Sequence, residues 1–311
     1  MNSYLELNAR QRLSRLLDAD SLTEFLPPSL RVCSPHLAQL DAPVAFDDGV
    51  IIGRARLQEH SIMVAAQEGG FMGGAVGEVH GAKLVGLLQR AIIEKVSAVL
   101  LLLETGGVRL HEANAGLIAV SEVMRALLDV RAAGIPVIVL IGGSNGCFGG
   151  MGIVACCANA IVMSEEGRLA MSGPEVIETA NGVEEFDSRD RALVWRTTGG
   201  KHRYLLGDCA MLVPDTVAAF RQAACDAINN VRQNEVALSL AALEQEHAML
   251  QARVDQFGSL TDPLAIWAQL GIADPDALAM LEADEFLART SAHRAMHRLP
   301  TATDNSAGSS A

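Results

Sequence analysis

Two short glycine-containing turns are the features of this sequence best suited to chemistry. Thr105-Gly106-Gly107-Val108 and Gly146-Cys147-Phe148-Gly149 each follow an apolar run and precede a helical pattern. A glycine turn ahead of a helix leaves backbone N–H groups at the positive end of the helix dipole. Two such turns can together hold one oxyanion, such as the enolate of a thioester, whereas a single turn often only reverses the chain. The predicted donors are the backbone amides of Gly106, Gly107, Val108, Cys147, Phe148 and Gly149.

Charged side chains follow the first turn directly. Arg109 could pair with a carboxylate, while His111 and Glu112 could transfer a proton. The alternative is that these residues form the solvated first turn of a helix with an ion pair inside it. The sequence leaves both interpretations open. A second charged segment, residues 187–191, favours a surface or subunit contact.

The remaining motifs are weaker. Neither a Gly-x-Gly-x-x-Gly pattern after a strand nor a P-loop pattern occurs in the sequence, which argues against dinucleotide and nucleotide binding. Gly142-Gly143-Ser144-Asn145-Gly146 matches the Gly-x-Ser-x-Gly elbow of serine hydrolases. In this minor alternative Ser144 is the nucleophile, and its partners would come from Asp187, Asp208, His202 and His247.

Composition excludes several classes of protein. The chain has 311 residues, 50% of them hydrophobic and 20% charged, which suits one large domain with a full core. Its net charge of -13 argues against binding to nucleic acid. The apolar runs are shorter than the roughly 20 residues of a membrane-spanning helix, and no secretory signal is visible, so we expect a cytoplasmic protein that binds no membrane. The six cysteines include no Cys-x-x-Cys pair, which predicts buried thiols and no metal site.

Strand, glycine turn and helix occur in this order twice, which predicts βαβ units and a parallel or mixed sheet with outer helices. We expect one domain over residues 1–300 and a disordered tail over 301–311. The expected strands are residues 50–57, 61–67, 98–103, 136–141 and 160–163. The expected helices are residues 4–26, 83–95, 111–132, 153–158 and a helical part over about 216–297.

Four segments together carry a family resemblance: Gly69-Gly70-Phe71-Met72-Gly73-Gly74, Glu104-Thr105-Gly106-Gly107-Val108-Arg109, Gly146-Cys147-Phe148-Gly149-Gly150 and Ser172-Gly173-Pro174-Glu175-Val176-Ile177-Glu178. Over about residues 5–212 the chain resembles the carboxyltransferase branch of the crotonase-like superfamily. Within this branch, these segments are most similar to the β subunits of biotin-independent malonate decarboxylases. The resemblance implies an α/β, crotonase-like (ClpP/crotonase) carboxyltransferase fold of stacked ββα units with outer helices.

The resemblance also implies an activity and its partners. A malonyl thioester, carried on the phosphopantetheine-type arm of an acyl carrier protein or on CoA, would lose carbon dioxide through an enolate, with neither biotin nor metal bound by this chain. The implied partners are a γ subunit of the same fold, an acyl carrier protein subunit and an acyl-carrier-protein transferase subunit. The implied thioester-binding residues are Gly69, Gly70, Gly73, Gly74, Gly146, Gly150, Ser172, Gly173, Pro174 and Glu175.

Two alternatives remain open. The first is the β subunit of a biotin-dependent acetyl-CoA or acyl-CoA carboxylase. Bacterial acetyl-CoA carboxylase subunits of this fold resemble the chain but have a four-cysteine zinc ribbon near the N-terminus, where this sequence offers only Cys33. The second is a non-catalytic scaffold subunit that binds its partner and the carrier.

Overall fold

The computed structural model describes residues 2–39, 49–234 and 238–295, and its centre is a seven-stranded sheet. The strands lie in chain order: β1 (Thr23–Phe25), β2 (Val50–Leu57), β3 (His60–Gln67), β4 (Ala98–Leu102), β5 (Val137–Ile141), β6 (Ala160–Ser164) and β7 (Met211–Val213). Strands β1, β2 and β3 pair antiparallel, and β3 to β7 pair parallel. Of the two arrangements that the sequence left open, parallel or mixed, the sheet has the mixed one.

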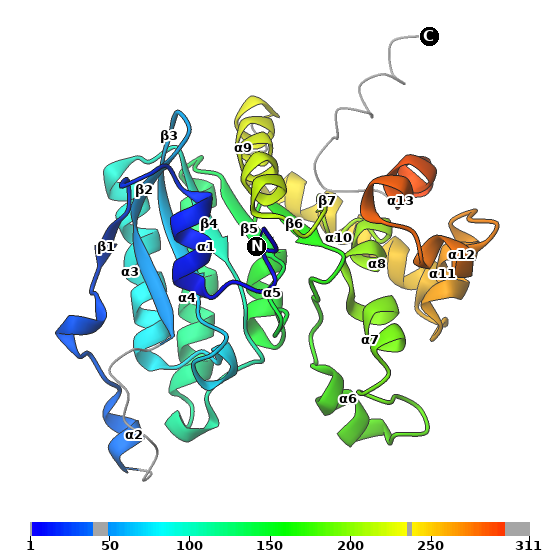
Figure 1. The fold of residues 1–311 in the computed structure, drawn as a ribbon, viewed down its shortest axis with the longest axis horizontal. Helices are drawn as coiled ribbons and strands as arrows, with labels where there is room; N and C mark the ends of the chain where they lie inside the picture. The colour runs from blue at the N-terminus through cyan, green and yellow to red at the C-terminus, as the bar shows by residue number, and fades with distance from the viewer. Residues whose placement is uncertain (1, 40–48, 235–237, 296–311) are drawn as a thin grey trace.

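Helices cover both faces of this sheet (Figure 1). On one face lie α3 (Glu78–Glu94), α4 (Ala115–Ala132) and α5 (Gly150–Cys156), and on the other lie α1 (Ala9–Leu16) and α9 (Val217–Asn234). Alternate residues of β4 consequently enter different cores: Val99 belongs to one buried cluster and Leu100 to the other. Burial on both faces explains why the parallel strands read as unbroken apolar runs.

The predicted N-terminal helix over residues 4–26 is wrong in both of its bounds. Helix α1 begins after Asn8, whose side chain forms a capping box with Gln11, and it ends at Leu16. Beyond it, Asp20 has a φ of 55°, which breaks any continuing helix. Residues 23–25 instead form the edge strand β1. The early apolar spacing therefore covers one short helix and a strand.

Three other predicted helices have different starts. Helix α3 begins at Glu78 rather than at residue 83, and α5 begins at Gly150 rather than at residue 153. The predicted helix over 111–132 divides into a 3-10 turn, η3 (Leu110–Glu112), and α4. Ala113 separates them because its φ of 50° and ψ of -125° are not helical.

The C-terminal part of the chain is helical beyond β7, as predicted. Helices α6 (Pro174–Asn181), α7 (Arg191–Thr198) and α8 (Gly200–Leu205) precede β7, and four more follow α9: α10 (Leu240–Phe257), α11 (Pro263–Gln269), α12 (Pro275–Ala279) and α13 (Ala283–Thr290). Figure 1 shows α6 to α8 and α10 to α13 beside the sheet, on the side of β7. The predicted tail over residues 301–311 lies outside the described residues.

Side-chain exposure corrects one further expectation. Cys147, Cys209 and Cys225 are buried as predicted, but Cys33 and Cys157 are partly exposed and Cys156, the last residue of α5, is exposed. Within the described ranges, no three His, Cys, Asp or Glu side chains gather in a way that could hold a metal ion. No helix in those ranges is long and apolar enough to cross a membrane.

Candidate functional site

The two glycine turns meet at the carboxyl edge of the sheet. They follow β4 and β5, which are parallel neighbours, so both turns emerge on the same side. The Thr105 N–H donates to the Gly146 carbonyl at 2.8 Å, and the Phe148 N–H donates to the Thr105 carbonyl at 3.0 Å. A Cβ atom on Gly149 would lie 3.2 Å from the Cα of Gly107. The structure thus brings the two predicted turns into direct contact.

Most of the predicted oxyanion donors already donate to acceptors within the chain. In the first turn, the Gly106 N–H donates to the Gly73 carbonyl at 2.9 Å and the Gly107 N–H to the Thr105 hydroxyl at 3.1 Å. In the second turn, the amides of Cys147, Phe148 and Gly149 donate to the carbonyls of Arg168, Thr105 and Met171. The turns therefore use these five N–H groups to hold their own shape.

Two amides beside the turns have no hydrogen-bond acceptor of this kind in the part of the chain that the structure describes. The N–H groups of Val108 and of Gly150, the first residue of α5, donate to no acceptor among the described residues. Both residues are partly exposed. Gly149 precedes Gly150 with a φ of 64°, a conformation that glycine adopts readily and that re-aims the chain into the helix. Both N–H groups are therefore available to an acceptor from outside the described chain.

Arg109 and Glu112 form a buried ion pair rather than a solvated helical turn. Their side chains are 1% and 0% exposed, and an Arg109 nitrogen lies 3.3 Å from a Glu112 oxygen. The Arg109 Nε donates to the Ala75 carbonyl at 2.9 Å, and Glu112 accepts the N–H of Glu78 at 2.5 Å. The pair therefore fastens the end of the first turn to the start of α3. His111 is exposed between them.

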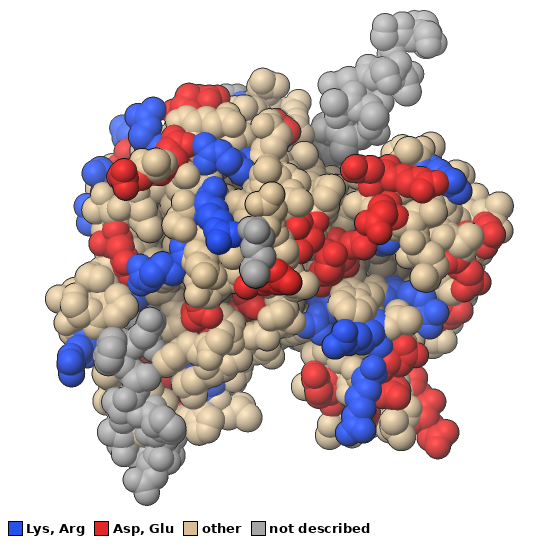
Figure 2. All heavy atoms as spheres, in the orientation of Figure 1, with Lys and Arg blue, Asp and Glu red and all other residues tan. Residues whose placement is uncertain are grey.

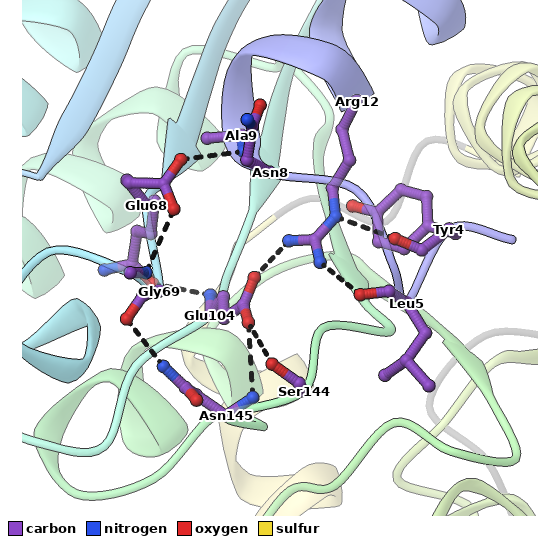
Figure 3. Close-up of polar contacts among 12 residues, drawn as sticks. Tyr4, Leu5, Asn8, Ala9, Arg12, Glu68, Gly69, Glu104, Ser144 and Asn145 are labelled. Atoms are coloured by element: carbon purple, nitrogen blue, oxygen red, sulfur yellow. Dashed lines mark hydrogen bonds and ion pairs between the residues drawn. The ribbon is translucent and has the colours of Figure 1, made fainter.

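Sequence reasoning missed the buried ion pair at the other end of the first turn. Arg12 of α1 pairs with Glu104, and their side chains are 2% and 6% exposed. The second Glu104 oxygen accepts the Ser144 hydroxyl and the Asn145 N–H, each at 3.2 Å (Figure 3). The available signal was a carboxylate directly after the wholly apolar run of β4, where a charge needs a partner.

The glycine segment over residues 69–74 lies against the first turn. Gly73 accepts the Gly106 N–H, and a Cβ atom on Gly74 would lie 2.0 Å from the Glu104 carbonyl oxygen. A Cβ on Gly69 would lie 2.5 Å from a Glu104 carboxylate oxygen, so this glycine makes room for Glu104. Gly70 is exposed and donates its N–H to Glu68 at 2.9 Å. Gly70 and Gly73 are the members of this segment that present an open surface.

The segment that leads into α6 runs beside the second turn. The Ala170 N–H donates to the Cys147 carbonyl at 3.3 Å, and Gly149 donates to Met171. Ser172 and Glu175 flank the helix start, where Gly173 is extended and Pro174 occupies the first helical position, a place that suits proline. Figure 2 shows an open notch between the sheet part and the part that carries α6 and α7.

A serine-hydrolase triad is not assembled in this structure. The Ser144 hydroxyl donates to Glu104 rather than to a histidine. His202 is buried and its Nδ1 accepts the Trp267 Nε1–H at 3.1 Å. Asp208 pairs with Arg203 and Arg253. The remaining two predicted partners, Asp187 and His247, have no contact with Ser144 among the described hydrogen bonds and ion pairs.

Comparisons with known proteins agree with this geometry. The sequence pattern of the carboxyl transferase domain matches residues 6–208. A malonyl-S-ACP:biotin-protein carboxyltransferase of Malonomonas rubra is 40% identical over 303 residues, covering 92% of this chain and 95% of the relative. The acetyl-coenzyme A carboxylase carboxyl transferase subunit beta of Fusobacterium nucleatum is 29% identical over 57% of this chain and 60% of that relative.

Solved structures of malonate decarboxylase complexes also contain chains similar to this one. A Pseudomonas malonate decarboxylase hetero-tetramer in complex with malonate contains a chain that is 42% identical, with a TM-score of 0.70 over 74% of this chain and 84% of that one. A Pseudomonas malonate decarboxylase hetero-dimer gives 37% identity and a TM-score of 0.60 over 73% of this chain and 88% of that one. Because the domain pattern spans more than half of the sequence and the Malonomonas relative is matched almost end to end, the chain belongs to the carboxyl transferase family.

Proposed function

We propose that this chain is the β-type carboxyltransferase subunit of a cytoplasmic malonate decarboxylase, which converts a malonyl thioester on an acyl carrier protein into the acetyl thioester. The likeness to the Malonomonas and Pseudomonas proteins supports the substrate class. The observation that carries the mechanism is the meeting of the two turns, which sets the amides of Val108 and Gly150 on adjoining chain segments.

The reaction needs an oxyanion site and little else. The bond between the α-carbon and the carboxylate breaks, carbon dioxide leaves, and the electron pair moves onto the thioester carbonyl as an enolate oxygen. Backbone N–H groups that are fixed in advance stabilise this oxygen most strongly as its charge develops. The enolate then takes one proton at carbon. The exposed His111, water or a partner residue can supply it.

The remaining predicted site residues have two roles in this proposal. The thioester arm of an acyl carrier protein or of CoA contacts the exposed Gly70 and Gly73 and the segment Ser172–Glu175 at the start of α6. Arg109 and Glu112 bind each other and keep the first turn in place, so they do not contact the malonyl carboxylate. A γ subunit of the same fold completes the active site, and acyl carrier protein and transferase subunits supply the loaded carrier.

A second candidate function is transfer of the malonyl carboxyl group to a biotin protein. It is favoured by the 40% identity to the Malonomonas relative, whose name specifies that acceptor. The two functions share the enolate and differ only in whether the carboxyl group leaves as carbon dioxide or is passed on. Biotin dependence therefore separates them.

The test is a decarboxylation assay with malonyl thioester on its carrier protein, run with the chain alone, with its partner subunit, and with both plus avidin. We expect carbon dioxide and acetyl thioester only when the partner is present, at a rate that avidin does not change. Inhibition by avidin would favour the biotin acceptor. An inactive complex would favour the scaffold alternative, and a fully active lone chain would contradict the need for a partner.

A further inference from the structure

The N-terminal helix α1 reaches the site through one buried arginine. Arg12 is 2% exposed, and one of its terminal nitrogens pairs with Glu104. Its Nε donates to the Tyr4 carbonyl at 3.0 Å, and its other terminal nitrogen donates to the Leu5 carbonyl at 3.3 Å. The guanidinium also lies 4.7 Å from the centre of the Tyr4 ring. These contacts with Tyr4 and Leu5 hold the guanidinium in the orientation in which it pairs with Glu104.

Glu104 extends this contact to both glycine turns. Its own backbone leads into Thr105 and the first turn, while one carboxylate oxygen accepts the Ser144 hydroxyl and the Asn145 N–H of the second turn. Asn145 in turn donates its side-chain N–H to the Gly69 carbonyl at 2.8 Å. One carboxylate thus connects the glycine segment and both turns to α1, as Figure 3 shows.

A second carboxylate strengthens the same connection. Glu68 follows β3 directly and accepts the N–H of Ala9, the first residue of α1, at 3.0 Å. It also accepts the Gly70 N–H at 2.9 Å. Two acidic residues at the carboxyl ends of neighbouring strands therefore bind the same short helix. Charge-assisted hydrogen bonds of this kind are shorter and stronger than neutral ones.

The chain has glycine at the two points where its backbone comes closest to the Glu104 carboxylate. A Cβ atom on Gly143 would lie 2.4 Å from the Glu104 carboxyl carbon, and one on Gly69 would lie 2.5 Å from a carboxylate oxygen. A side chain at either position would overlap the Glu104 carboxylate as it stands. A buried charge that is packed this closely fixes the distance between the segments that it joins.

From these contacts we infer that Arg12 and Glu104 are positioning residues for the proposed decarboxylation. Neither touches the reacting atoms; their ion pair sets the spacing of the two turns that carry the Val108 and Gly150 amides. This inference rests on the proposed function. Oxyanion donors act only when they are already in place, and a misplacement of about 1 Å can cost about a hundredfold in rate.

The first experiment compares Glu104→Gln with Arg10→Gln in the complete complex. Glu104→Gln keeps the side-chain shape but removes the charge that pairs with Arg12. Arg10 lies on the same helix, and its pair with Glu24 at 2.8 Å is 53% exposed on the arginine side, so it is the matched control. We expect kcat to fall about a hundredfold in Glu104→Gln with KM changed by less than about threefold. Arg10→Gln should stay within about twofold of wild type in both.

A double variant separates positioning from folding. Arg12→Met with Glu104→Leu removes both charges at nearly constant volume, a replacement that buried ion pairs often tolerate. Its thermal midpoint should stay near that of wild type while kcat remains about a hundredfold low, because Ser144 and Asn145 lose their acceptor. Amide hydrogen exchange over residues 105–108 and 143–150 should be faster in this variant and unchanged in Arg10→Gln.

Each outcome decides between the alternatives. A folded double variant with wild-type kcat would overturn the inference, and so would a kcat that falls only in proportion to the folded fraction. If Glu104→Gln and the double variant both unfold, Arg12→Lys decides the question, because lysine keeps the charge but cannot reproduce all the hydrogen bonds of Arg12. A lower kcat in the fully folded variant, with faster exchange over residues 105–108 and 143–150, supports positioning. A wild-type kcat and exchange rate, with only the stability reduced, refutes it. If the wild-type complex releases no carbon dioxide, the proposed function fails, and the exchange comparison still tests the contact.

Discussion

The carboxyl edge of the sheet, called the site edge below, and the C-terminal helices both bury ionisable side chains. The two regions differ in whether the buried side chain is charged and paired or neutral and hydrogen-bonded. At the site edge, Arg12 with Glu104 and Arg109 with Glu112 are buried as charged pairs, one at each end of the first turn. Among the C-terminal helices, His202 is buried and accepts a hydrogen bond from Trp267. Burial lowers the pKa of His202 to about 3, so this ring is neutral.

The difference indicates what each region must do. A buried charge pair is costly to desolvate and contributes little net stability. Removal of one partner nevertheless destabilises the fold strongly, because the other charge remains buried without a partner. Such pairs suit a region whose geometry must be held. The neutral His202 packs in the core and accepts the Trp267 N–H, so it contributes to the stability of the helical part. We therefore expect changes at the site edge to affect both stability and rate, and changes around His202 to affect only stability, in a manner that depends on pH.

The largest expected effect is that of Glu112→Ala. It removes the buried carboxylate beside Arg109 and the acceptor of the Glu78 N–H, so the free energy of unfolding should fall by about 3–5 kcal/mol. Urea denaturation measures it. Glu122→Ala is the control, because Glu122 and Arg125 form an exposed pair with the same three-residue spacing. Equal unfolding midpoints in the two variants would contradict the role assigned to the buried pair.

The next effect concerns the contact between the turns. Gly149→Val places a side chain 3.2 Å from the Cα of Gly107 and should lower kcat about a hundredfold or more by separating the donors. Gly134→Val is the control, since Gly134 also has a positive φ, of 74°, but has no atom within 4 Å of the new Cβ. Steady-state rates of the folded proteins decide it, and equal rates in both variants would exclude an oxyanion site between the turns.

A smaller, pH-dependent effect should appear in the helical region. Between pH 6.5 and about 3 the unfolded chain binds a proton at His202 that the folded chain does not. Stability from this group is therefore complete above pH 6.5 and falls by about 1.4 kcal/mol per pH unit as the pH is lowered. His202→Gln should flatten this part of the profile in urea titrations. The wild-type slope in the variant would show that other groups cause it.

The smallest effect expected is that of His111→Ala on the rate. His111 is exposed and is not part of the ion pair beside it, so its loss should lower kcat less than about tenfold if water or the partner protonates the enolate. A fall of about a hundredfold or more, with an unchanged melting temperature, would instead identify His111 as the proton donor. Single-turnover measurement of acetyl thioester formation distinguishes the two.

Local patterns predicted the strands more accurately than the helix ends. Strands β4 and β5 were predicted within one residue at each end, because a short continuous apolar run bounded by a glycine turn is typical of a strand buried on both faces. Helix α3 was placed five residues late. Its first N–H donates to Glu112, which is 34 positions away in the sequence, and Gly77 at the N-cap has no side chain to cap the helix. Local sequence therefore does not predict where this helix begins.

By itself, the sequence determined that the sheet is parallel or mixed, that two glycine turns follow its strands and that the chain resembles a carboxyltransferase, since these depend on local apolar runs and glycine spacing. Only the tertiary structure decided which amides remain for an anion, because the carbonyls of Arg168 and Met171 accept the N–H groups of Cys147 and Gly149, and the Thr105 carbonyl accepts that of Phe148. The same holds for Glu104, whose partner Arg12 lies 92 positions away and resembles an ordinary surface arginine on a short helix. The pairing of Arg12 with Glu104 depends on the packing of α1 against the sheet, which the local spacing of residues does not predict.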